Sequence, residues 1–74
     1  MRKINETGPG IWSVFKEGDK LPCAQFIDEL EARVYACAMD AAEEARDQNT
    51  INTMSAFAAR GHKEVRSAMA DWKP

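Results

Sequence analysis

The sequence is poor in the residue types from which metal and catalytic sites are built. It has one histidine, His62, and two cysteines, Cys23 and Cys37, in 74 residues. Tight zinc sites use Cys and His at short paired spacings such as CxxC or HxxxH, and neither spacing occurs. His62 has no glycine-built oxyanion turn beside it that would complete a nucleophilic site. The sequence therefore favours a protein without enzyme activity, and we expect no cofactor and no metal.

Long apolar runs are also missing. No run approaches the roughly 18 apolar residues of a membrane span, and the basic start MRKINETGPG lacks the apolar segment of a signal peptide. On a single helix, Cys23 and Cys37 would lie about 21 Å apart, beyond the reach of a disulfide. We expect two half-buried free thiols, a cytoplasmic location and no membrane partner.

Size and charge point to a protein that binds something. A single domain of 74 residues buries only about 60% of the surface of its unfolded chain, so a homodimer or a stable complex is expected. The net charge of −2 is uneven, because residues 21–48 carry seven acids against two arginines, whereas residues 57–74 are mildly basic. A nucleic-acid binder is usually more basic. A protein partner is favoured, with nucleic acid as the weaker choice.

The first half of the sequence predicts an arm, a strand and a long helical segment. Residues 1–10 end in ETGPG and are interpreted as a flexible lead-in. IWSVF, residues 11–15, is typical of a strand, which pairs either within the chain or across a dimer. Pro22 suits a helix start, and apolar residues then recur every three or four positions to residue 45. The pattern leaves open one long helix or two within residues 22–47.

The second half predicts two shorter helices. DQNT, residues 47–50, breaks the pattern, and Asn49 or Thr50 can cap the next helix. Gly61 is placed at the end of that helix, before a short last one. The fold class is thus mostly α: one small domain, residues 1–74, of three or four helices with an N-terminal β-strand or extended arm, α+β if the strand pairs. The expected core is Trp12, Val14, Phe26, Ile27, Leu30, Val34, Ala38, Met54, Phe57, Val65, Met69 and Trp72.

Two groups of charged residues are candidate binding sites. An acidic face on the long helical segment would steer the protein towards a basic surface, one that normally holds nucleic acid. Its members are Asp28, Glu31, Asp40, Glu43, Glu44 and Asp47. The second group lies around Gly61, where residues 50–72 look like a helix-turn-helix that could meet DNA. Its members are Arg60, His62, Lys63 and Arg66.

GIWSVFKEGDKLPCAQFIDELEARVYA, residues 10–36, resembles the N-terminal part of the HigB-like branch of the RelE/ParE toxin superfamily. The residues that carry the resemblance are Trp12, Val14, Gly18, Pro22, Phe26, Leu30, Val34 and Ala36. KEVR, residues 63–66, looks like the segment that opens a core strand in those toxins. The resemblance implies action on the ribosome or RNA, by a shortened relative without the catalytic C-terminal strands. No RNase residue of the family has a counterpart here.

These observations lead to one functional expectation and two alternatives. The expectation is a small non-enzymatic protein that binds and masks a surface of a larger host protein, as an inhibitor or anti-defence protein of a phage or mobile element does. One alternative is a toxin relative, of toxin–antitoxin type, acting on the ribosome or RNA. The other is a small helix-turn-helix DNA-binding regulator using residues 50–72.

Overall fold

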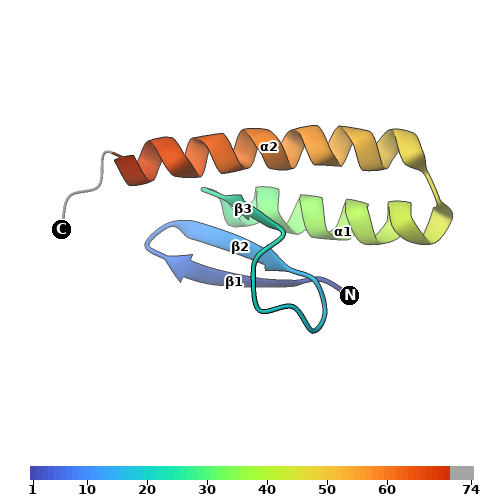
Figure 1. Cartoon of the computed structure of the whole chain (residues 1–74), viewed down its shortest axis with the longest axis horizontal. Helices are drawn as coiled ribbons and strands as arrows, with labels where there is room; N and C mark the ends of the chain where they lie inside the picture. The colour runs from blue at the N-terminus through green and yellow to red at the C-terminus, as the bar shows by residue number, and fades with distance from the viewer. Residues whose placement is uncertain (71–74) are drawn as a thin grey trace.

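A computed structural model describes residues 1–70 as three strands followed by two helices (Figure 1). The elements are β1 (Lys3–Gly8), β2 (Ile11–Phe15), β3 (Ala24–Phe26), α1 (Glu29–Ala45) and α2 (Gln48–Ala70). The strands form one antiparallel sheet in the order β1-β2-β3. In Figure 1, α1 runs between α2 and the strands. The fold is therefore a small α+β fold in which helices make up most of the described residues. The expected α+β class is confirmed, because the strand at residues 11–15 pairs. The expected number of helices, three or four, is wrong, because residues 1–70 form two.

The interpretation of residues 1–10 as a flexible lead-in is wrong for the strand β1. Lys3 pairs with Phe15 and Gly8 with Ile11, so β1 and β2 form a hairpin. Its turn is made by Pro9 and Gly10, and Gly10 has a φ of +72°, a conformation that glycine adopts without strain. TGPG is therefore a turn signal. The strand at residues 11–15 is confirmed, and it pairs within the chain on both sides.

The prediction of a helix beginning at Pro22 is also wrong, because residues 24–26 form β3. Ala24 lies opposite Val14, and Phe26 lies opposite Trp12. These four side chains share one face of the sheet, since side chains alternate along a strand. That face packs on the helices and belongs to the core. Phe26 fits an apolar period of two as well as a period of four, and sheet pairing decides between them.

α1 is one helix, and it buries only one of its two apolar stripes. Its inward side chains are Ala32, Tyr35, Ala36, Met39 and Ala42. Leu30 is 67% exposed and Val34 is 47% exposed, so neither belongs to the core. Ile27 and Met69 are also about half exposed. Their assignment to the core is wrong, because regular spacing shows that a stripe exists without showing which stripe faces the sheet.

The turn between the helices is two residues long and makes them antiparallel. Arg46 ends α1 in the left-handed conformation, with a φ of 57°. Asp47 then caps α2: one carboxylate oxygen accepts a hydrogen bond from the Thr50 amide at 3.2 Å, and the other accepts one from its hydroxyl at 2.6 Å. The predicted break at residues 47–50 is confirmed. The cap is Asp47 rather than Asn49 or Thr50, and its negative charge also suits the positive end of the helix dipole.

α2 continues without a break through Gly61, so the predicted helix end there is wrong. Gly61 is buried where α2 crosses β3, against the ring of Phe26 and the carbonyl oxygen of Gln25. Close approach, rather than a turn, explains this glycine. The helix-turn-helix expected over residues 50–72 lacks its turn.

The core forms around the fully buried Phe26, whose ring centroid lies 5.5 Å from that of Tyr35 and 5.1 Å from that of Phe57. The expected core residues Val14, Phe26 and Val65 are confirmed as buried. Trp12, Met54 and Phe57 pack against the cluster, and Ala38 is half-buried. Trp72 lies outside the described residues.

Candidate functional site

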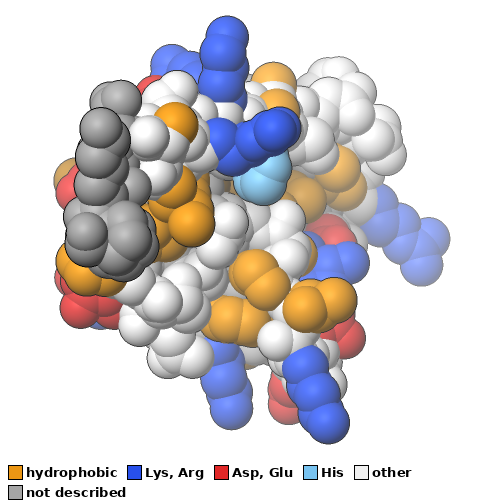
Figure 2. All heavy atoms as spheres, turned by 60° about the vertical axis from the view of Figure 1, so that its left-hand side comes forward, with side chains coloured by type: hydrophobic (Ala, Val, Ile, Leu, Met, Phe, Trp, Pro, Cys, Tyr) orange, Lys and Arg blue, Asp and Glu red, His pale blue; other side chains and the backbone are white. Residues whose placement is uncertain are grey.

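A mainly apolar hollow lies where the β1–β2 turn approaches the C-terminal end of α2. It has a volume of about 380 Å³, and its apolar lining comes from Pro9, Ile11, Ile27, Ala68 and Met69. Figure 1 shows the turn and this helix end at the same end of the molecule. Figure 2 brings that end forward and shows hydrophobic side chains gathered there in patches. Because Ile27 is 45% and Met69 55% exposed, this hollow can receive an apolar side chain of another molecule.

Two acidic side chains lie close to this apolar hollow in the structure or in the chain. A carboxylate oxygen of Glu6 accepts a hydrogen bond from the Gly10 amide at 3.2 Å, which places Glu6 beside the turn. Asp28 follows Ile27 in the chain and precedes α1. Among residues 1–70, no lysine or arginine lines the hollow itself. An apolar centre with acidic flanks suits a partner surface that presents an apolar side chain among basic ones.

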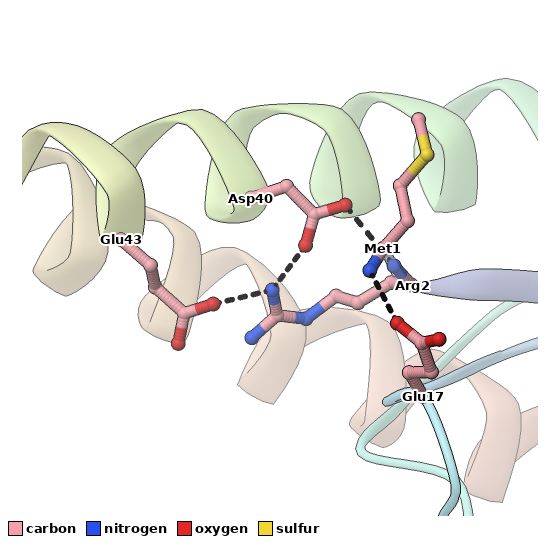
Figure 3. A network of polar contacts seen from close by, with 5 residues as sticks. All are labelled: Met1, Arg2, Glu17, Asp40 and Glu43. Carbon is pink, nitrogen blue, oxygen red and sulfur yellow. Dashed lines mark hydrogen bonds and ion pairs between the residues drawn. The ribbon is translucent and has the colours of Figure 1, made fainter.

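A second feature is an ion cluster that joins the start of the chain to α1 (Figure 3). The guanidinium of Arg2 donates hydrogen bonds to Asp40 at 2.5 Å and to Glu43 at 2.6 Å. The Arg2 amide donates to the other oxygen of Asp40 at 3.1 Å. The Arg2 side chain is only 4% exposed, whereas the pair of Met1 and Glu17 nearby is exposed. The cluster links the start of β1 to α1 and stabilises the fold.

The cluster changes the acidity of its members. Burial opposes the ionisation of Asp40, but the hydrogen bonds from the amide and guanidinium of Arg2 outweigh it and lower the pKa of Asp40. The hydrogen bond from Arg2 lowers the pKa of Glu43, and the same bond raises the pKa of Arg2. Burial raises the pKa of Tyr35 in the core beside this cluster. Both carboxylates are therefore ionised at neutral pH.

Acid is expected to weaken the fold through this cluster. Carboxyl groups with a lowered pKa in the folded state stabilise it above their unfolded pKa values, 3.8 for Asp40 and 4.5 for Glu43. This stabilisation is lost as the pH falls through the lower folded values. We expect Arg2→Gln to cost about 1 to 2 kcal/mol at pH 7, a figure that allows for the partial exposure of both acids. The measurement is urea unfolding at pH 7 and at pH 3.

The difference between wild type and Arg2→Gln should shrink at pH 3, because protonated acids no longer need the guanidinium. Lys3→Gln is the matched control: it removes a neighbouring exposed charge that makes no ion pair among residues 1–70. An equal loss of stability in both variants at pH 7 would contradict the role of the cluster.

The structure brings only part of the predicted acidic face together. Asp40 and Glu43 share one guanidinium, and Asp47 caps α2. Glu31 and Glu44 lie about 140° apart around α1 at 100° per residue, so they do not share a face. Asp28 directly precedes α1, whereas Asp47 follows its other end. The six acids surround the helix and its ends.

The predicted basic group is brought together more closely. His62, Lys63 and Arg66 line one shallow hollow of about 430 Å³ on the outer side of α2. His62 also lines a neighbouring hollow beside β3. Arg60 points elsewhere, with its guanidinium carbon 5.4 Å from the ring centre of Phe57. Three of the four residues thus form a basic surface, although on a continuous helix.

Sequence reasoning missed the apolar hollow and the ion cluster. The hollow is assembled from a turn, a loop and a helix end, and its one available signal was GPG before a strand. Arg2 lay in the segment interpreted as a lead-in, so its partners were not sought. Cys23 and Cys37 are free, as expected, but both are exposed rather than half-buried.

Comparison with protein-family models, curated proteins and solved structures finds no match for this chain. The resemblance to the HigB-like toxins stays a prediction. It placed Phe26 in a helix, whereas Phe26 lies in β3. Among residues 1–70, neither helix has the length and apolarity that a membrane crossing requires. In the same part of the chain, no three His, Cys, Asp or Glu side chains are grouped so that they could hold a metal ion.

Proposed function

We propose that this protein is a non-enzymatic binder that docks on a larger protein and masks a basic surface of it. The observation that carries the proposal is the apolar hollow between the β1–β2 turn and the end of α2, with its half-exposed Ile27 and Met69. Large apolar side chains that stay exposed around a concave surface are typical of protein contacts.

The residue types at the hollow support a protein partner over a small molecule. Methionine is enriched in protein interfaces because its flexible side chain adapts to the opposing surface. Gly10 of the turn lines the hollow and has no side chain, so a partner can approach it closely. A side chain of the partner that enters the hollow would be covered on several sides, as the anchor residues of interfaces are.

The acidic flanks supply orientation. Glu6 and Asp28 add negative charge beside the apolar centre, and the neighbouring Glu29 lies in the first turn of α1. Basic residues of the partner would be attracted before contact, which raises the association rate and makes it sensitive to salt. Of the predicted acidic face, Asp28 would take part in this attraction. Asp40 and Glu43 bind Arg2, and Asp47 caps α2.

The test compares two glutamates placed at different points of α2. Met69→Glu puts a charge into the hollow, whereas Ala56→Glu puts the same charge on an exposed position that lines none of the four hollows described. Tagged wild type and variants capture partners from a bacterial lysate with and without nuclease, and mass spectrometry identifies them. We expect one stoichiometric protein that survives nuclease with wild type and Ala56→Glu. We expect Met69→Glu to bind it at least about tenfold more weakly.

The same experiment separates the alternatives. If capture disappears with nuclease and with Lys63→Glu/Arg66→Glu, the basic hollow on α2 is the site and nucleic acid is the partner. Ribosomal proteins lost in that way would favour the toxin-like alternative. Equal capture by Met69→Glu and wild type, at equal helicity by circular dichroism, would contradict the apolar hollow as the docking site.

A further inference from the structure

The outward face of α1 carries a second apolar stripe with the spacing of a coiled-coil seam. Leu30, Val34, Cys37 and Ala41 follow one another at steps of four, three and four residues. All four are exposed. In heptad notation they occupy positions d, a, d and a. The residues that α1 buries in its own domain occupy b, c and f, so the helix has one face for its own core and one unpartnered face.

We propose that α1 pairs with α1 of a second copy of this chain, antiparallel and about a twofold axis. The twofold axis makes the two surfaces identical, as in most homodimers. This inference uses the outer face of α1 and not the hollow of the proposed function, so each can fail without the other.

Side-chain size favours the antiparallel direction. If the twofold axis passes between Val34 and Cys37, Leu30 packs against Ala41 of the second copy. Val34 then packs against Cys37 of the second copy. Each of the four layers then joins one large and one small side chain, and the helix axes keep an even separation. A parallel pair would join Leu30 to Leu30 and Ala41 to Ala41. Two large side chains would hold the helices apart at one end, and two small ones would leave a gap at the other.

Charge favours the same direction. Arg33 and Asp40 occupy the flanking g positions, which meet each other across an antiparallel pair. Arg33 then faces Asp40 of the second copy, which keeps its bonds to Arg2 in a cluster of two carboxylates and one guanidinium that stays negative overall. The twofold axis repeats the contact. A parallel pair would give Arg33 an uncharged neighbour, Ala38, and would set Glu44 against Glu44. Arg33 is available for the contact, because its side chain is 64% exposed and its one ion pair within residues 1–70 is a long 3.4 Å contact with Glu29.

The seam is short, so the dimer is expected to be weak. Four layers fall at the small end of specific interfaces. Sedimentation velocity from about 10 to 500 μM should show wild type passing from monomer to dimer. Val34→Glu should weaken association at least about a hundredfold. The reason is that each copy contributes position 34, so the substitution places a charge in two of the four layers. Ala56→Glu on α2 is the control and should associate as wild type does.

A disulfide experiment tests the direction. With Cys23→Ser removing the other thiol, Val34→Cys should oxidise readily to a covalent dimer that joins Cys37 to the new cysteine at position 34. Cys23→Ser alone should not cross-link, because an antiparallel pair keeps the two Cys37 Cα atoms beyond the 7 Å or so that a disulfide spans. A single monomer at every concentration would overturn the proposal, and so would ready joining of Cys37 to Cys37, which indicates a parallel pair.

Discussion

Gly61→Ala is expected to destabilise the protein by about 2 kcal/mol, although alanine is the better helix former. In an open helix position the substitution would gain about 1 kcal/mol. Here a Cβ atom would lie 2.6 Å from Cε1 of Phe26 and 2.7 Å from the carbonyl oxygen of Gln25. The ring is held in the core, and the carbonyl belongs to the backbone of β3, so neither moves without disturbing the sheet. Overpacking of this kind costs about 1 to 3 kcal/mol.

Urea unfolding followed by circular dichroism measures the effect. Ser55→Ala, at an exposed position on the same helix, is the matched control and should be neutral or slightly stabilising. Gly61→Val should cost more than Gly61→Ala, because its larger side chain meets the same ring and carbonyl. A stability for Gly61→Ala equal to or above that of wild type would show that α2 does not cross β3 at this distance.

The strand at residues 11–15 and the break at residues 47–50 were predictable because each has a strong local cause. Ile, Trp, Val and Phe favour a strand, and an Asp-containing polar turn interrupts an apolar period. β3 lacks such a cause. It is three residues long, and its Phe26 also fits the helical spacing that continues to Leu30 and Val34. Only pairing with β2, a contact distant in sequence, assigns it to the sheet.

Gly61 shows the same limit at a single position. A glycine between two helical patterns is most simply interpreted as a helix end. The alternative is that glycine is needed because α2 passes close to β3. That contact involves Phe26, which lies 35 residues earlier in the chain. The candidate sites follow this rule: His62, Lys63 and Arg66 were predictable together because one helix carries them, whereas the apolar hollow is built from three separate segments.

Phe26→Ala is expected to cost about 3 to 5 kcal/mol, the largest effect that we expect of a single side chain among residues 1–70. Phe26 is fully buried and its ring lies against those of Tyr35 and Phe57, so its removal leaves a cavity that three elements surround. A domain of this size has a total stability of about 4 to 11 kcal/mol, so the variant would lose a large share of it.

Leu30→Ala is the informative control, because the sequence pattern predicts both Leu30 and Phe26 to be core residues. Leu30 is 67% exposed, so its truncation should change stability by less than about 0.5 kcal/mol in dilute protein, where α1 is unpaired. Urea midpoints from circular dichroism give both values. Similar losses for the two variants would mean that α1 turns its other stripe to the sheet, and the assignment of Leu30 and Val34 to a surface for a second copy would fail with it. A large loss for Phe26→Ala alone would establish that the stripe through Leu30 is free for association.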